Sequence, residues 1–351
     1  MLSPTIIVRP VVKRKHTMRH FVRKAEIAGL ALMTVSARAQ APASVGRTFY
    51  VDFERGADTN TGDRPERPFR RSPGDPEGAH AAAAVQLQPG DRVVFRGGIV
   101  YRGALNLAAT GAPDRPIVFD GNTAGDFGGG RAILDGAVTL TDWTRVTLGE
   151  SDRPGAGPGD RVLYRAFAPR GVTGPSAHLH WNGRLLTLAQ HPAPTDPLAV
   201  DDHSRYLRVP PGRATATTIR DERLTALGGA ALIGAYAMVW RSANDIDTRR
   251  ITAWDAATQT ITFEKLRQPP YTNQDTRYSI VNAPTPSVLS APGMYVVLDA
   301  QPAADGRVAV LLWPPDGADP NRAEVTASLR DHAFSLGPDV GHLTIQGFLI
   351  R

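Results

Sequence analysis

The feature that most constrains the fold is a stretch between residues 88 and 103, where two brief strands are separated by glycine. A Pro-Gly-Asp turn leads into an alternating strand, and a Gly-Gly corner turns the chain into a second strand that ends at Tyr101. Related pieces recur at 131–136 and 342–351. Short strands that turn at glycines are typical of a coiled sheet whose turns stack on one another. The stretch therefore predicts the first coil of a right-handed parallel β-helix.

Composition favours an all-β fold and excludes cysteine chemistry. The chain of 351 residues contains 34 glycines and 29 prolines but no cysteine. Abundant glycine and proline indicate many turns and short strands. The lack of cysteine excludes disulfides, a thiolate zinc site and a cysteine nucleophile. At this length the chain can bury a sizeable core, and we expect two structural units.

The N-terminus has the three parts of an export signal. A basic segment precedes an apolar core at 27–35, and Ala37-Arg38-Ala39 fits a small-x-small cleavage site. We therefore predict that residues 1–39 are a Sec-type signal peptide and that the protein is secreted or periplasmic in a bacterium; a disordered basic tail is the alternative. Met1 and Met18 are both candidate starts. The nine apolar residues of this core are too few to span a bilayer, so we expect no membrane span.

Charge disfavours a nucleic-acid partner. Residues 1–44 hold eight basic side chains and one acid, a charge of +7. Because the whole chain has a formal charge of +6, the remainder carries −1. A nucleic-acid binder needs its basic footprint in the folded body, and this one concentrates it in the leader.

Breaks in the strand pattern divide the rest of the chain into three segments. Residues 40–148 are predicted to form an N-terminal cap, with a short helix at 78–87, and the first coils of the β-helix. After a run rich in glycine and proline, residues 149–291 are predicted to form an inserted antiparallel β-sandwich or barrel, with a hairpin turn at 255–259. Residues 292–351 are then expected to return to the β-helix, truncated at the last residue.

Several short motifs follow one another in a fixed order. They are Tyr50-Val51-Asp52, the polar loop 58–63, Pro68-Phe69, the helix 78–87, Pro89-Gly90-Asp91, the corner from Gly97 to Tyr101, Asn182-Gly183 through Pro192, Tyr278 with Asn282-Ala283-Pro284, Pro292-Gly293 and Ile345-Gln346-Gly347-Phe348. This order resembles exported bacterial right-handed parallel β-helix proteins of the pectate-lyase-like superfamily. The resemblance extends from about residue 48 to 351 and rests on the order, since no single motif is specific.

The resemblance implies a carbohydrate-active enzyme, a glycoside hydrolase or a polysaccharide lyase, that acts on a polysaccharide or oligosaccharide and is a monomer when full length. Its catalytic groups would project from middle coils of the β-helix. We expect those coils beyond Arg351, so this fragment is predicted to be inactive. Met294 stands where the family often has an acid, which puts any role for that acid in doubt. The alternative is a non-catalytic secreted protein that binds glycan or serves as a surface structure.

Five residues are predicted to bind substrate, and none is assigned to catalysis. His178 and His180 lie two apart on one strand face and could bind a sugar or a metal, although a solvated strand before a tight Asn-Gly turn is the preferred interpretation. His191 could line a cleft or make a structural polar contact. Trp240 and Arg241 could stack on and clamp a sugar, or Trp240 could simply be half-buried in a sheet.

Two acidic stretches complete the candidates. Asp201-Asp202-His203 could bind a cation, but its proline-rich surroundings favour an exposed loop. Asp58, Asn60 and Asp63 could hold calcium through oxygen ligands. Their spacing does not match an EF-hand, and a turn rich in Asp and Asn is the preferred interpretation. We therefore predict no cofactor, with calcium as the one alternative.

Overall fold

The computed structural model describes residues 6–8, 46–146, 162–194, 203–242, 245–285 and 287–351. The predicted signal peptide, 1–39, lies outside this part of the chain except for the strand β1 (Ile6–Val8). Strands dominate the described residues, so the fold is all-β as predicted. None of the helices within these ranges is long and apolar enough to cross a membrane. The chain divides into two compact units, one of residues up to Gly136 together with Arg330–Arg351, and one of Ala137–Leu329.

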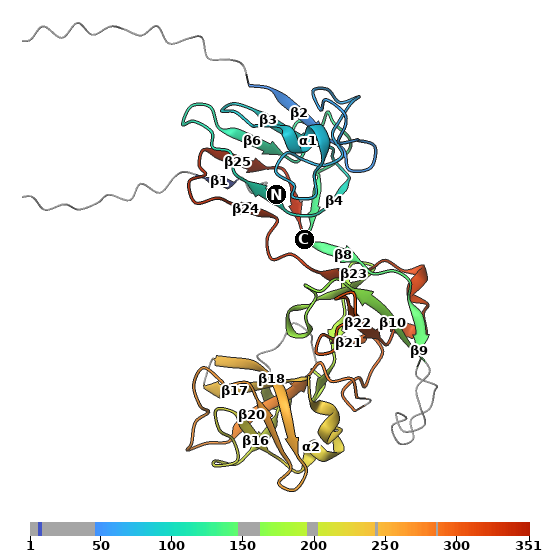
Figure 1. Cartoon of the computed structure of the whole chain (residues 1–351), viewed down its shortest axis with the longest axis vertical. Helices are drawn as coiled ribbons and strands as arrows, with labels where there is room; N and C mark the ends of the chain where they lie inside the picture. The colour runs from blue at the N-terminus through green and yellow to red at the C-terminus, as the bar shows by residue number, and fades with distance from the viewer. Residues whose placement is uncertain (1–5, 9–45, 147–161, 195–202, 243–244, 286) are drawn as a thin grey trace, which may run out of the picture. The chain divides into compact units, whose positions relative to one another are not determined.

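The first unit is built mainly of parallel strand pairs (Figure 1). One ladder runs through β2 (Thr48–Val51), β3 (Arg92–Phe95), β6 (Ile117–Asp120) and β25 (Leu343–Gln346), with β1 antiparallel on β25. A second contains β4 (Val100–Arg102), β7 (Ile133–Asp135) and β26 (Leu349–Ile350), and a third pairs β5 (Leu105–Leu107) with β24 (Phe334–Leu336). Successive turns of the chain therefore lie on one another, with the closing residues stacked on 117–135.

The glycine corners of this unit are required by close backbone approach. A Cβ on Gly97 would lie 2.1 Å from the carbonyl oxygen of Gly130, and a Cβ on Gly121 would lie 2.5 Å from that of Gly347. Both distances are far inside van der Waals contact, so neighbouring turns could not stack with any other residue there. The predicted helix at 78–87 is shorter than expected, because α1 covers only His80–Ala84.

The second unit contains three sheets that are largely antiparallel. The first has the order β13 (Thr187–Leu188), β21 (Met294–Leu298), β22 (Val308–Leu312), β10 (Leu163–Ala168) and β9 (Thr144–Val146), in which only β13 and β21 are parallel. The second has the order β12 (Arg184–Leu185), β11 (Leu179–Trp181), β23 (Val325–Ser328) and β8 (Ala137–Thr139).

The third and largest sheet has seven strands. Their order is β14 (Gln190–His191), β20 (Thr276–Val281), β17 (Tyr236–Ser242), β18 (Asp245–Asp255), β19 (Thr260–Phe263) and β16 (Thr218–Arg220), with β15 (Leu207–Val209) also on β20. Short 3₁₀ turns complete the described elements: η2 (Gly174–Ser176), η3 (His203–Arg205), η4 (Gly229–Leu232), η5 (Pro315–Gly317) and η6 (Pro320–Arg322).

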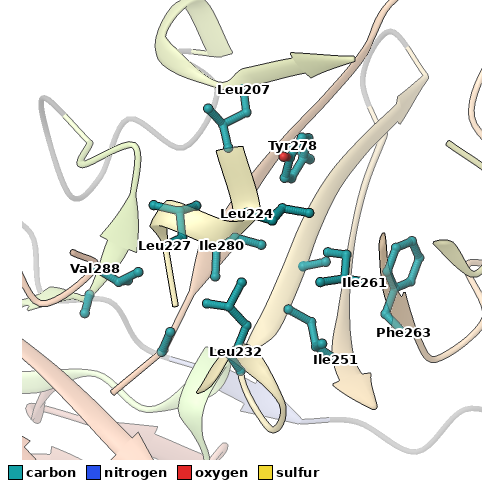
Figure 2. Packing of buried hydrophobic residues seen from close by; sticks show 14 of the residues in the cluster. Leu207, Leu224, Leu227, Leu232, Ile251, Ile261, Phe263, Tyr278, Ile280 and Val288 are labelled. Atoms are coloured by element: carbon teal, nitrogen blue, oxygen red, sulfur yellow. The ribbon is translucent and has the colours of Figure 1, made fainter. Parts of the chain in front are cut away.

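The seven-stranded sheet has one apolar face, which we call the covered face. Its side chains pack with those of α2 (Arg223–Ala226) and η4 into a common core, and Figure 2 shows Leu224, Leu232, Ile251 and Ile280 within it. Ala237 and Val239 of β17, Ile251 of β18, and Tyr278 and Ile280 of β20 point into this core. Burial of apolar surface on this one face holds the sheet and its small helices together.

The boundaries between the two units differ from the predicted domain boundaries. The predicted inserted domain spans 149–291, whereas the second unit spans Ala137–Leu329. The difference arises because β21, β22 and β23 pair with strands of this second unit. The predicted return at 292 therefore comes later, with β24, β25 and β26.

Candidate functional site

His178 directly precedes β11 and His180 lies within it, and the two side chains lie on one side of a small sheet. Leu179 is fully buried, so His178 and His180, its neighbours in a strand, point to the opposite face. His178 is exposed and His180 is half-buried opposite Thr326. Within the described ranges no group of three or more His, Asp or Glu side chains could hold a metal ion. A sugar-binding role for this pair stays a prediction.

His191 lies on β14, opposite Ile280 of β20, and its peptide bond to Pro192 is cis. Burial lowers the pKa of the imidazole below its usual value; a backbone hydrogen bond at Ser287 acts in the other direction, and the charge of Arg223 lowers the pKa further. The side chain is therefore neutral at neutral pH. It lies on the edge of the covered face, which fits a structural contact as well as a binding one.

Trp240 and Arg241 point to opposite faces of the seven-stranded sheet. Arg241 contacts Asp247, which lies opposite Val239 of the covered face, whereas Trp240 lies opposite Ile246. They do not form the common clamp that their adjacency suggested. Arg241 is 4% exposed and its Nε is 3.1 Å from Oδ2 of Asp247. Arg267 donates from Nε to the same carboxylate over 2.6 Å, and its backbone N–H donates over 2.8 Å. Arg241 is thus part of a buried ionic network.

This network keeps Asp247 ionised. Burial acts to raise the pKa of the carboxyl group, but the hydrogen bonds from Arg267 and the charges of Arg249 and Arg267 outweigh it and lower the pKa. Asp245 also accepts from Arg241. The arrangement satisfies its own charges, so it offers little to a ligand.

Trp240 lies on the other side of the sheet, which we call the open face. Cross-strand register places Arg277 of β20 directly opposite Trp240, and Arg208 of β15 directly opposite Arg277. Trp240 and Arg277 are half-buried and Arg208 is exposed. Tyr206 packs edge-to-face against Trp240 with ring centroids 6.2 Å apart. We call Arg208, Arg277, Trp240 and Tyr206 the arginine–aromatic cluster.

The opposite end of the open face is closed by polar contacts to the neighbouring sheet. The Tyr236 hydroxyl donates to Oδ2 of Asp299 over 2.7 Å, and Arg250 donates to the same oxygen over 3.1 Å. Burial first, and then the contact with Asp299, raises the pKa of Tyr236 above its usual range. Asn282 makes two bonds of 2.7 Å with the backbone of Val297. These contacts join the two sheets at the end of the face away from the cluster.

Buried aspartates of the described residues are all neutralised by arginine. The pairs are Asp52 with Arg96, Asp91 with Arg47, Asp120 with Arg92, Asp135 with Arg102, Asp221 with Arg223, Asp247 with Arg267 and Asp299 with Arg250. A general acid for glycoside cleavage needs a raised pKa. In this part of the chain every carboxyl group with a resolved shift has a lowered pKa: Asp63, Asp91, Asp120, Asp221, Asp247, Asp255 and Asp305.

Two side chains of the acidic stretch 58–63 make hydrogen bonds with the backbone of their own loop. Asp58 accepts from the backbone N–H groups of Arg71 and Ala79 over 2.7 and 3.1 Å. Asn60 donates to the carbonyl of Pro68. Their polar atoms thus fix a turn, which is the arrangement preferred above over calcium. Asp201 and Asp202 lie outside the described residues.

Comparison with known proteins gives a likeness in fold. No protein-family model matches the chain, and no curated protein matches it. A solved structure titled "Glycoside hydrolase" superposes on 80% of this chain with a TM-score of 0.52 at 15% identity. The chain spans 46% of that protein's length. At this identity the likeness concerns the fold alone.

Two further solved structures match less well. The complex of XylC with xylose has a TM-score of 0.36, with 15% identity over 82% of this chain and 32% of that one. The GH136 lacto-N-biosidase from Eubacterium ramulus has a TM-score of 0.20, with 25% identity over 27% of this chain and 14% of that one. Such scores are too low to carry an argument.

Sequence reasoning identified Trp240 but missed its neighbours. Arg208 and Arg277 stand in separate short strands, far from Trp240 in sequence, and become neighbours only through strand register. The alternation of Thr276, Arg277 and Tyr278 does indicate that Arg277 faces away from the core. It gives no indication of which strand lies beside it.

Proposed function

We propose that this chain is part of a carbohydrate-active protein, a glycoside hydrolase or polysaccharide lyase built on a right-handed parallel β-helix. The observation that carries the proposal is the superposition of 80% of the chain on a solved glycoside hydrolase. The parallel ladders of the first unit support the β-helix, because three separate strand stacks joined by tight glycine corners are what a coiled parallel sheet requires. Export through a Sec-type signal and a monomeric whole protein belong to the same proposal.

We infer that the described residues bind glycan and do not themselves supply the catalytic pair. Cleavage of a glycosidic bond uses two carboxyl groups, one of them a proton donor. Buried aspartates in this part of the chain are held ionised by arginines, as described above. The open face, in contrast, carries a half-buried indole, Trp240, on the strand beside Arg277, and Arg208 opposite Arg277. A non-catalytic glycan-binding role is therefore the second candidate.

Affinity electrophoresis of the full chain tests the proposal. Gels would contain neutral polysaccharides such as xylan and galactan or acidic ones such as polygalacturonate and alginate, with serum albumin as the reference. We expect retarded migration in at least one of them. Migration that no polysaccharide retards would contradict a carbohydrate-active protein.

A turnover assay on the same panel tests the inference about catalysis. New reducing ends report hydrolysis and absorbance of unsaturated uronate reports lyase cleavage. We expect binding without either product. Cleavage by the chain that is lost when a paired aspartate is replaced by alanine in a variant that still folds would support the carbohydrate assignment and contradict our inference that catalytic carboxylates are absent from the described residues.

A further inference from the structure

We propose that the arginine–aromatic cluster is a subsite for the anionic group of an acidic saccharide, a uronate carboxylate or a sulfate ester. This inference rests on the proposed function and adds a substrate class to it. The cluster lies on the open face, away from the apolar core on the covered face. Nothing in the packing of the fold requires two arginines at this place.

The first argument is an excess of unneutralised positive charge. Arg208 and Arg277 occupy directly opposed positions on β15 and β20, where side chains lie about 5 Å apart at Cβ and like charges destabilise the pair. No acid of the described residues forms an ion pair with either. Arg223, Arg241 and Arg250 of the same unit are paired with aspartates, whereas the exposed Arg220 has no ion pair among the described residues. An anion at the cluster would remove the repulsion.

The second argument is the chemistry of the two groups. Guanidinium groups bind carboxylates and sulfates through paired charge-assisted hydrogen bonds. Arg208 and Arg277 together present more N–H donors than one carboxylate needs for a bidentate pair. Both can therefore contact the same carboxylate or sulfate on a sugar ring. Binding such an anionic group is the simplest explanation for two opposed arginines at this place.

The third argument is the aromatic neighbour. Trp240 stands directly opposite Arg277 and is steadied by the edge of Tyr206, whose hydroxyl contacts the sulfur of Met238 at 3.2 Å. A half-buried indole held in this way can stack on the apolar side of a sugar ring. An aromatic platform beside cationic groups is the combination that a ring bearing a carboxylate or sulfate would recognise.

The fourth argument is a buried hydroxyl without a partner. Ser279 lies two residues from Arg277 on the same strand face, is fully buried, and its hydroxyl has no hydrogen-bond partner. Leaving such a group unsatisfied costs free energy. Because an external ligand cannot reach a fully buried hydroxyl directly, a water enclosed beneath the cluster would satisfy it.

The experiment measures binding of the full chain to oligogalacturonate, to a sulfated galactan oligomer and to a neutral galactan oligomer of equal length by isothermal titration calorimetry. We expect at least one acidic oligomer to bind about tenfold or more tightly than the neutral one, since each charge-assisted contact contributes at this level. Preference for oligogalacturonate identifies a carboxylate, and preference for the sulfated oligomer identifies a sulfate ester. Equal affinity for all three would overturn the inference.

Variants locate the effect. In Arg208→Gln/Arg277→Gln we expect the preference for acid to disappear while binding of the neutral oligomer remains. Arg220→Gln, an exposed arginine on β16 of the same sheet, is the matched control and should keep the preference. Retained acid preference in the double variant would overturn the subsite and leave the proposed function standing. If the wild-type chain binds none of the three oligomers, the proposed function itself is overturned.

Discussion

Arginines in two regions of this molecule have opposite surroundings. In the first unit, arginines near strand ends are neutralised by buried aspartates of adjacent strands or turns. The pairs are Arg96 with Asp52, Arg92 with Asp120 and Arg102 with Asp135. On the open face of the second unit, Arg208 and Arg277 face each other without a described acid. The difference indicates that the first group serves the fold and the second is available to an external anion.

The largest expected effect is a loss of folding stability at low pH. The pKa values of Asp91, Asp120, Asp221 and Asp247 are lowered in the folded chain, because hydrogen bonds and arginine charges outweigh the cost of burial. A lowered folded pKa gives stability that is present above the unfolded value of about 3.9 and is lost as pH falls through the folded value. Urea unfolding should therefore show a steep loss of the free energy of unfolding below about pH 4. A smaller fall is expected between pH 7 and 5, because the lowered pKa of the buried His191 opposes its protonation in the folded chain. A flat profile down to pH 3 would contradict structural neutralisation.

Removal of one buried carboxylate should cost about 3 kcal/mol. Asp120 is fully buried and accepts from Arg92, from both the N–H and the hydroxyl of Thr123, and from Gln346. Asp120→Ala leaves these donors without a partner and should lower the free energy of unfolding in urea by this amount. Asp114→Ala, at an exposed loop residue, is the control and should change it by less than about 0.5 kcal/mol. Equal losses of the free energy of unfolding in the two variants would contradict a structural role for the buried Asp120.

Trp240→Ala should weaken glycan binding about tenfold, because a stacked aromatic contributes about 1–1.5 kcal/mol. Calorimetry with acidic and neutral oligomers should show similar losses for both, since the indole recognises the ring and not the charge. The half-buried Trp254 on β18 provides the control, and Trp254→Ala should leave binding unchanged. A loss confined to the acidic oligomer would mean that Trp240 acts through the arginines.

The smallest effect has the opposite sign. Arg277→Gln relieves the repulsion from Arg208 and should leave stability unchanged or raise it by about 0.3 kcal/mol. Arg92→Gln, which breaks the pair with Asp120, should lower it instead. Thermal and urea unfolding of the two variants give the comparison directly. A clear destabilisation by Arg277→Gln would assign that arginine to the fold.

The sequence predicts the strands of the first unit well, because their signals are local. Strands at 92–95 and 100–102 flank the Gly-Gly corner as expected, and the turn at 255–259 does join the antiparallel strands β18 and β19. The return after residue 292 is different. Strand β22 pairs with β10, whose residues lie far earlier in the chain, and no local pattern indicates such a partner.

The candidate site shows the same limit. Alternation along β17 places Trp240 on the face opposite Val239. The register of β17 on β18 shifts between Trp240 and Ser242, so the place of Arg241 is known only from its contact with Asp247. The approach of Arg277 and Arg208 to Trp240 depends on the register of three strands, which sequence does not specify. Residues of one strand are therefore accessible to sequence reasoning, and a site shared among strands is not.

The most direct test of the central claim is the salt dependence of glycan affinity. The affinity of the full chain for its preferred acidic oligomer would be measured at 50 and 300 mM NaCl, alongside Arg208→Gln/Arg277→Gln. If Arg208 and Arg277 bind the anionic group, the wild-type affinity should fall as salt screens the contact, and the double variant should have a weaker and nearly salt-independent affinity. An equal salt dependence in both proteins would contradict the assignment of the open arginines to an anionic saccharide.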